Sequence, residues 1–315
     1  MEVRNLGRSG LRVSAIGLGC NNFGGRIDLE ATRKVLHQAL DLGITLFDTA
    51  DTYGNRGGAE TEMGQVLHAD QRKGIVLATK FGMPMDDAGV KVGGSRRYIM
   101  QAVEDSLRRL CTDWIDLYQI HAPDPRTPIE ETLRALDDLI RQGKVRYIGC
   151  SNFPAWQMVE AQWTSRVNGL NAFVSCQDEY SLLVRNVVEP QLRPAMLQYG
   201  LGLLPFAPLA SGALTGKYRR NAPLPSGTRL ANTARLAERY LTERNWSVAE
   251  RLAEFAEASG HTLLELGFGW LLAQAPVASV IAGATRPEQL QQNVKAGGWR
   301  LSAEELAAVD RIVAV

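Results

Sequence analysis

The chain has 315 residues, of which 45% are hydrophobic and 22% are charged, and its formal net charge at pH 7 is +1. These values are ordinary for a soluble globular protein, and they give no electrostatic reason to expect a nucleic acid or a membrane surface as partner. No apolar run approaches the roughly 20 residues that span a bilayer, and the first ten residues lack the apolar core of a signal peptide, so we expect a cytoplasmic protein.

The cysteines and histidines give no sign of a disulfide framework or a metal site. Cys20, Cys111, Cys150 and Cys176 are far apart and form no C-x-x-C pair. We expect them to be reduced thiols in the core. The four histidines have no metal-ligand spacing, so we expect no structural metal.

Short apolar strands and amphipathic helices are expected to alternate along the chain. A hairpin at 3–14 precedes strands expected at 15–18, 44–48, 75–79, 114–120, 145–149, 172–176, 202–207 and 277–282. Helices are expected at 29–42, 59–68, 95–110, 128–142, 154–165, 187–199, 246–259, 262–274, 287–295 and 302–312. The segment 209–245 is the least regular, and a loop of this length is usually functional or mobile.

Strict alternation of strands and helices predicts a parallel α/β sheet, either an open doubly wound sheet or a closed barrel. The glycines after the first strand do not have the G-x-G-x-x-G spacing of a doubly wound dinucleotide fold. No change in composition divides the chain. We therefore predict one domain over residues 1–315, a (β/α)8 TIM barrel with an N-terminal β-hairpin and extra helices.

In such a barrel the carboxyl ends of all strands open onto one face, where active sites lie. Asp48 ends one strand and Tyr53 follows it, while Lys80 and His121 end the next two strands. Each has an ordinary explanation on its own: Asp48 as a turn cap, Tyr53 as a packed aromatic, Lys80 as a residue reaching solvent and His121 as a rim histidine.

Together these four residues suit acid–base chemistry on a carbonyl group. An ammonium beside a phenol lowers the pKa of the phenol, and a carboxylate can hold the ammonium in place. We predict that Tyr53 donates a proton, Lys80 tunes it, Asp48 holds Lys80, and His121 stabilises charge on the carbonyl oxygen. No side chain supplies hydride, so a nicotinamide cofactor is required.

With these residues the chain resembles the aldo-keto reductase superfamily, in the bacterial branch related to the β-subunits of voltage-gated potassium channels. The resemblance extends over nearly the whole chain. The matching stretches are NLGRSGLRVS at 5–14, FDTADTYG at 47–54, LATKF at 77–81, DWIDLYQIH at 113–121, IGCSN at 148–152, FAPLASGALTGK at 206–217 and IAGATRPEQ at 281–289.

The resemblance implies that NADP(H), or alternatively NAD(H), lies extended across the carboxyl face. Contacts to the nicotinamide are expected from Ser151, Asn152, Gln177 and, by stacking, Tyr180. Contacts to the pyrophosphate are expected from Phe206, Pro208, Leu209, Ser211 and Lys217. Contacts to the adenosine and its 2′-phosphate are expected from Gly283, Thr285, Arg286, Gln289, Gln292 and Asn293, beside the N-terminus of helix 287–295, which is a ready anion site.

The chain departs from the family at the 2′-phosphate site. Family members often carry Lys at the position of Gly283, Arg at that of Gln289 and Glu at that of Gln292. Arg286 is the only cation in that stretch, so the choice between NADP and NAD stays open.

The function that the resemblance implies is reduction of aldehydes or ketones to alcohols, with hydride from nicotinamide C4 and a proton from Tyr53. One alternative is a nicotinamide-binding regulatory or scaffold subunit with slow reductase activity. Another is a barrel enzyme that uses Lys80 as a Schiff base, which is disfavoured because Lys80 beside Asp48 should be protonated. The sequence leaves open the carbonyl substrate, the reaction direction and whether the protein is a monomer or a homo-oligomer.

Overall fold

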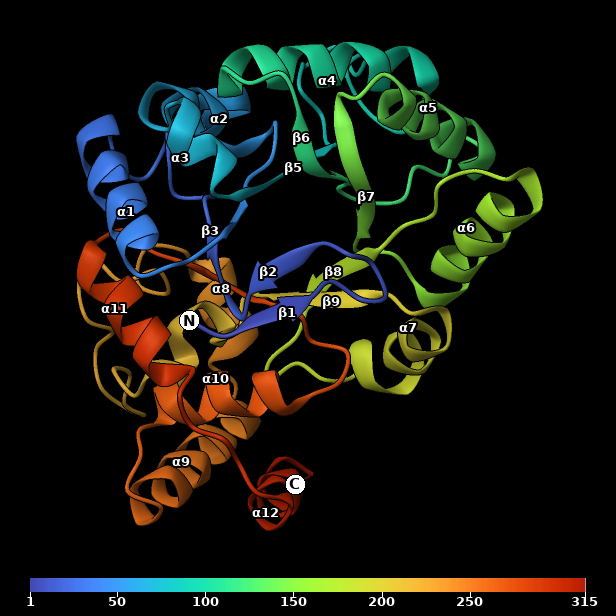
Figure 1. Cartoon of the computed structure of the whole chain (residues 1–315). Coiled ribbons are helices and arrows are strands. Elements are labelled where there is room, and N and C mark those ends of the chain that lie inside the picture. The colour runs from blue at the N-terminus through green and yellow to red at the C-terminus, as the bar shows by residue number, and fades with distance from the viewer. Residues whose placement is uncertain (315) are drawn as a thin grey trace.

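Eight parallel strands form the barrel at the centre of the structure, a computed structural model that describes residues 1–314 (Figure 1). In sheet order the strands are β10 (Val280–Gly283), β3 (Ile16–Gly19), β4 (Leu46–Asp48), β5 (Val76–Phe81), β6 (Ile115–Ile120), β7 (Val145–Ser151), β8 (Ser175–Glu179) and β9 (Gly202–Phe206). A parallel bridge between Leu203 and Val277 joins β9 to the segment before β10. The predicted (β/α)8 fold is therefore confirmed.

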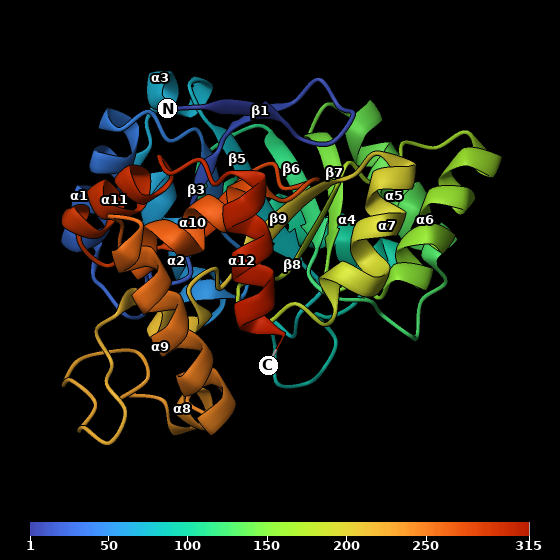
Figure 2. The same cartoon turned by 90° about the horizontal axis from the view of Figure 1, so that it is seen from below.

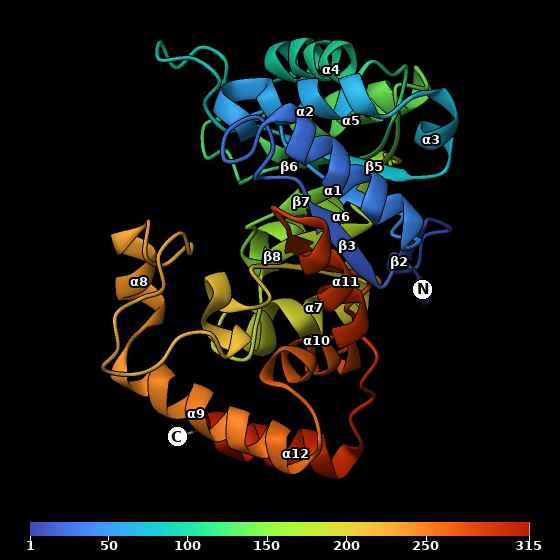
Figure 3. The same ribbon diagram turned by 90° about the vertical axis from the view of Figure 1, so that its left-hand side faces the viewer.

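Helices surround this barrel, as the two turned views show (Figures 2 and 3). They are α1 (Leu29–Asp41), α2 (Tyr53–Val66), α3 (Ala69–Lys73), α4 (Arg96–Leu110), α5 (Ile129–Arg141), α6 (Ala155–Asn168), α7 (Arg193–Tyr199), α8 (Ala234–Tyr240), α9 (Glu243–Ala258), α10 (Leu263–Ala273), α11 (Pro287–Ala296) and α12 (Ala303–Val313). No helix among residues 1–314 combines the length and the apolar character needed to cross a bilayer.

The predicted N-terminal hairpin is present, as β1 (Val3–Asn5) paired with β2 (Arg12–Ser14). It lies across one mouth of the barrel (Figure 1). Leu6 and Val13 are fully buried and belong to the core cluster of the barrel interior. The hairpin thus plugs the amino end of the barrel, which leaves the carboxyl end as the open face.

Every second residue of a barrel strand points inward, so the inward side chains form layers stacked along the barrel axis. The inward residues of the apolar layer include Leu46, Ala78, Leu117 and Leu204. Two residues further along the same strands, at the carboxyl end, are Asp48, Lys80, Gln119 and Phe206. Three of these four residues are polar, so the layer nearest the open face carries polar side chains inside the barrel.

Several elements differ from the prediction. The predicted strand at 172–176 is wrong by three residues, because β8 is Ser175–Glu179, paired with both β7 and β9. Helix α3 was not predicted. The irregular segment 209–245 contains a short 3-10 helix (Ala210–Thr215) and α8, and a π-helical turn (Val188–Leu192) precedes α7.

The prediction of four core cysteines is wrong for one of them. Cys20, Cys150 and Cys176 are buried, but Cys111 is exposed. Cys111 ends α4 in the left-handed region with a φ of 51°, a conformation that favours glycine. Its exposure follows from this position at the end of the helix.

Candidate active site

A cavity of about 310 Å³ opens at the carboxyl end of the barrel. Its lining includes ten of the residues predicted from sequence: Asp48, Tyr53, His121, Ser151, Asn152, Gln177, Phe206, Pro208, Ser211 and Gly283. These residues come from the ends of six strands and from the segments that follow them. The barrel therefore brings these ten residues together at one cavity.

Asp48 and Lys80 form a fully buried ion pair beneath this cavity. Lys80 Nζ lies 2.6 Å from Asp48 Oδ2 and 2.9 Å from the backbone oxygen of Thr49, to which it also donates. Burial opposes the charge on Lys80, but the effects of Asp48 and Tyr53 together outweigh it, so the pKa of Lys80 is raised. Lys80 is therefore a protonated ammonium held by Asp48.

Asp48 also binds two amides through its other oxygen. Gln119 Nε2 and Gln177 Nε2 donate to Asp48 Oδ1 at 3.1 and 2.9 Å. Gln119 was missed in the sequence analysis, although alternation along β6 from the buried Leu117 places it inside the barrel. Asp48 thus connects Lys80 to Gln177, one of the residues expected at the nicotinamide.

Tyr53 lies between Lys80 and His121 at the cavity wall. The Lys80 ammonium is 5.1 Å from the centre of the Tyr53 ring, and the rings of Tyr53 and His121 meet edge to face at 5.7 Å. Burial raises the pKa of Tyr53, and the opposing effect of Lys80 is smaller. The expected lowering of the pKa is therefore wrong in its net direction, and Tyr53 holds its proton at neutral pH.

His121 follows β6 directly and is fixed by its backbone. Its N–H donates to Phe81 O at 2.8 Å, and its carbonyl accepts from Asn152 Nδ2 at 2.9 Å. Burial, followed by the charge of Lys80, lowers the pKa of His121 to about 3. The imidazole is therefore neutral at physiological pH and carries one N–H donor.

Tyr180 lies away from the cavity. Its side chain is fully buried, its ring packs 5.1 Å from that of Trp270, and its hydroxyl donates to Glu189 Oε1 at 2.8 Å. The geometry does not support the predicted stacking on a nicotinamide ring. Phe206, at the end of β9, is the aromatic ring of this region that does line the cavity.

The remaining predicted cofactor residues lie outside the cavity lining. Leu209 and Lys217 belong to the segment after β9. Thr285 and Arg286 directly precede α11, and Gln289, Gln292 and Asn293 lie within it. Gln289 Oε1 accepts from the backbone N–H of Thr285 at 2.7 Å and of Arg286 at 3.2 Å. Gln289 therefore caps α11 itself, while Arg286 and Gln292 are exposed to solvent.

The sequence analysis missed a set of side-chain contacts that join α8 to the barrel at the cavity. Glu179, the last residue of β8, pairs with Arg239 and accepts a hydrogen bond from Tyr240 Oη, which joins α8 to the barrel. All three residues line the cavity. With β8 placed correctly, alternation from Gln177 would have indicated Glu179.

Arg229 is a second cavity residue that was missed. Its side chain is partly buried, and burial lowers its pKa, with the neighbouring charge of Arg26 acting in the same direction. No ion-pair partner for Arg229 is found in residues 1–314. The cavity therefore presents one uncompensated positive charge, which suits an anionic ligand.

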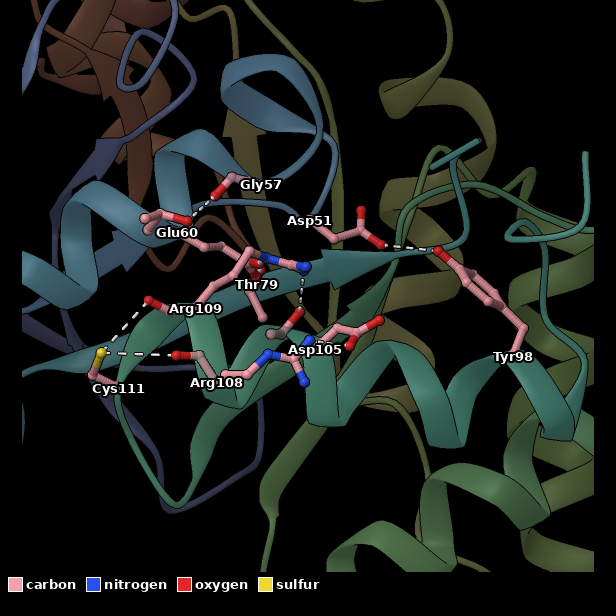
Figure 4. Close-up of polar contacts among 11 residues, drawn as sticks. Asp51, Gly57, Glu60, Thr79, Tyr98, Asp105, Arg108, Arg109 and Cys111 are labelled. Carbon is pink, nitrogen blue, oxygen red and sulfur yellow. Dashed lines mark hydrogen bonds and ion pairs between the residues drawn. The ribbon is translucent and has the colours of Figure 1, made fainter. Parts of the chain in front are cut away.

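The segment that carries Tyr53 is fixed from behind by a second polar cluster (Figure 4). Glu60 of α2 is completely buried, accepts from Thr79 Oγ1 at 2.5 Å and pairs with Arg109 Nε of α4 at 2.7 Å. Arg109 also packs against Gly57, where a Cβ would lie only 2.6 Å from Arg109 Cδ. The close contact requires glycine at this position.

Residues 54–57, directly after Tyr53, all have positive φ. Asn55 and Arg56 have φ values of 59° and 68°, which cost roughly 1–2 kcal/mol each for residues other than glycine. The regular part of α2 therefore starts only after this left-handed turn, close to the predicted start at 59. Such strain persists only where the surroundings hold the backbone, here between α4 and the barrel.

Asp51 lies in the same cluster, and only 1% of its surface is exposed to solvent. Tyr98 Oη donates to Asp51 Oδ2 at 3.3 Å, whereas Oδ1 has no hydrogen-bond partner in the described chain. Burial, followed by the charge of Glu60, raises the pKa of Asp51 to about 8, against the opposing effect of Arg109. Asp51 is therefore a neutral carboxylic acid at pH 7.

No group of three His, Cys, Asp or Glu side chains within residues 1–314 is arranged to hold a metal ion. The site instead combines a buried ammonium–carboxylate pair, a protonated phenol and a neutral imidazole at the open end of a TIM barrel. This is the class of barrel protein equipped to move a proton at the carboxyl face.

Residues 15–314 match the Aldo/keto reductase family, and the chain belongs to that family. It is 37% identical over its whole length to the L-glyceraldehyde 3-phosphate reductase of Escherichia coli K12, of which it covers 93%. It is 38% identical over 94% of its length to a probable voltage-gated potassium channel subunit beta of Arabidopsis thaliana, of which it covers 91%. The family and the reductase relative support an oxidoreductase.

Proposed function

We propose that this protein reduces aldehydes or ketones to alcohols with NADP(H), and that Tyr53 donates the proton. The observation that carries the proposal is the Lys80–Asp48 ion pair, 2.6 Å long and buried beneath Tyr53 and His121. The L-glyceraldehyde 3-phosphate reductase relative supports an aldehyde as substrate. A cytoplasmic location agrees with the composition of the chain.

The side chains divide the work as follows. His121, neutral, donates its N–H to the carbonyl oxygen and orients it toward Tyr53. Tyr53 transfers its hydroxyl proton to that oxygen as negative charge develops there. Lys80 stabilises the phenolate that remains, and Asp48 keeps the ammonium in place.

The cofactor supplies the hydride. The cavity fits the nicotinamide end of such a group, because Ser151 and Asn152 offer a hydroxyl and an amide at its wall. Gln177 Nε2 already donates to Asp48, so Gln177 is left to accept through Oε1. We assign the ring contact to Phe206 in place of Tyr180, and the phosphates to Arg229, Ser211 and the start of α11.

The proposal is tested by Tyr53→Phe, with Tyr147→Phe at the opposite end of the barrel as the matched control. Loss of the acid should lower kcat for a good aldehyde by about 10²–10⁴-fold. Binding of NADPH, followed by fluorescence, should stay close to wild type because the ring remains. A Tyr53→Phe enzyme with wild-type turnover would refute the role of Tyr53.

A second candidate function is a nicotinamide-binding regulatory subunit, which the potassium channel subunit relatives favour. The two candidates differ in turnover. Tight NADPH binding with no reduction of any aldehyde or ketone above background would favour the regulatory subunit.

A Schiff base on Lys80 is disfavoured by its surroundings. Lys80 is completely buried, its ammonium is paired with Asp48, and its pKa is raised. A lysine nucleophile needs the opposite shift. Borohydride trapping with a carbonyl substrate should therefore leave Lys80 unmodified.

A further inference from the structure

Helix α6 presents an apolar stripe to solvent. The relative solvent exposures of Trp156, Trp163 and Val167 are 65%, 48% and 77%, and Glu160 lies between the two tryptophans in sequence. At 100° per residue these four positions fall within about 60° of one another around the helix. We call Trp156, Glu160, Trp163 and Val167 the α6 stripe.

Helix α6 packs against the rest of the fold through the face opposite the stripe. Met158, Ala161, Gln162 and Ser165 are the buried residues of the helix. In Figures 1 and 2, α6 lies at the rim of the helix ring between α5 and α7, with its outer side away from the rest of the fold. The fold of one chain therefore does not need the α6 stripe.

Two tryptophans on one exposed helix face differ from the scattered exposed apolar residues of an ordinary surface. Trp163 is held in place, because its Nε1 donates to Tyr199 Oη of α7 at 2.8 Å, and Arg166 stacks on its ring at 5.3 Å. A rigid aromatic side chain of this kind is typical of the centre of a protein–protein interface.

The charges beside the α6 stripe are of opposite sign and are not compensated within the chain. Glu160 and Arg166 are exposed, and neither has an ion-pair partner among residues 1–314. They are six residues apart, too far to face each other along one turn of their own helix. When a second copy of such a surface is turned by 180°, the negative charge of each copy can face the positive charge of the other.

We propose that the α6 stripe pairs with the same stripe of a second copy of this chain, with the two helices antiparallel about a two-fold axis. The stripe positions are spaced by four, three and four residues, so they read the same in both directions. Trp156 then meets Val167 of the second copy, and Glu160 lies against Trp163 within reach of Arg166 of that copy. Each such contact occurs twice, as two-fold symmetry requires.

The size of the stripe sets the strength of this pairing. With roughly 150–250 Å² for a whole tryptophan surface, the stripe offers on the order of 300 Å² of apolar area per copy. A stable interface buries about 800 Å² per partner, so neighbouring residues must form the rim. The dimer should therefore depend on protein concentration.

The first test is the sedimentation of the full chain over a wide range of concentration. The wild type should shift from one to two chains as concentration rises. Trp156→Glu should weaken the dimer at least about tenfold, because it removes a large aromatic anchor and places a charge against the apolar Val167 of the second copy. Val90→Glu is the matched control and should leave the dimer unchanged. Val90 is 67% exposed but lies in the loop between β5 and α4, not on α6.

The second test exchanges the charges. Glu160→Arg and Arg166→Glu should each be monomeric, because each makes like charges meet across the two-fold axis. Mixing the two variants should restore a dimer, since both cross pairs become attractive. The proposal is overturned by a monomeric wild type at all concentrations, by a dimer insensitive to Trp156→Glu, or by a mixture that stays monomeric.

Discussion

Replacement of Asp51 by asparagine should change the pH dependence of stability more than any other single substitution in the polar cluster behind Tyr53. Asp51 is a buried acid with one oxygen bonded to Tyr98 and the other unpartnered within the described chain. The groups that face it are Glu60 of α2 and Arg109 and Tyr98 of α4. Asparagine keeps the shape of the protonated acid and cannot ionise.

The magnitude follows from linkage between protonation and folding. In the folded chain the pKa of Asp51 is about 8, against an ordinary value of 3.8. Between these values the folded chain holds a proton that the unfolded chain has lost, so stability falls as pH rises. The loss is about 1.4 kcal/mol per pH unit, which amounts to a few kcal/mol across the window. Stability from this source is complete below about pH 4 and is lost by about pH 8.

The assay is the free energy of unfolding in urea at several pH values, for the wild type and for Asp51→Asn. The difference should be small near pH 4 and should grow in favour of the variant up to about pH 8. Asp105→Asn is the matched control, because Asp105 lines the same cavity of about 150 Å³ but is partly exposed and paired with Arg108. Asp105→Asn should not show the growing difference expected for Asp51→Asn, because it replaces no fully buried carboxyl group.

Parallel stability curves for the wild type and Asp51→Asn would refute this reasoning. They would mean that Asp51 has the same protonation in the folded and unfolded chain. Water in the adjoining cavity would then have to solvate Asp51 Oδ1, and the carboxylate would be charged beside Glu60.

Two further predictions concern the cofactor. Arg286→Ala should raise the Kd for NADPH by at least about tenfold and leave that for NADH nearly unchanged, since a charged hydrogen bond contributes about 1.5–3 kcal/mol. Equal changes of the two Kd values in fluorescence titrations would remove Arg286 from the 2′-phosphate site. Glu179→Gln removes the charge that holds Arg239 and Tyr240 over the cavity, so NADPH release measured by stopped-flow fluorescence should become about tenfold faster. An unchanged release rate would show that α8 does not retain the cofactor.

Much of the architecture could be predicted from the sequence, because the spacing of apolar residues and the local composition indicate strands and helices. Apolar runs with β-branched residues placed seven of the eight barrel strands closely. Two of the helices predicted to begin near Ser95 and Ser302 are capped by the side chains of these residues. The proposed catalytic residues followed from one rule, that the carboxyl ends of parallel strands meet at one face. Asp48 and Lys80 are 32 residues apart in sequence, and their 2.6 Å contact follows from adjacent strands in register.

The errors arose where a strand does not look apolar. Phe173 and Val174 have strand composition, but β8 continues through Gln177 to Glu179, because pairing with β7 and β9 sets its register. Its polar residues face the cavity, where burial does not select apolar side chains. Composition therefore placed the strand too early and concealed Glu179. Tyr180 was assigned to the nicotinamide ring by resemblance to the family, whereas its ring packs against Trp270, away from the cavity.

The stretch from Asp48 to Tyr53 has two polar sides, and the difference between them explains how it can present a proton donor. On the barrel side, Asp48 receives an ammonium and two amides. On the helix side, Asp51 receives one phenol and stays neutral. A second carboxylate charge on this short segment would act on Lys80 as well and compete with Asp48 for it. A neutral Asp51 leaves the Lys80 charge directed at Asp48 and Tyr53, which is where the proposed proton transfer needs it.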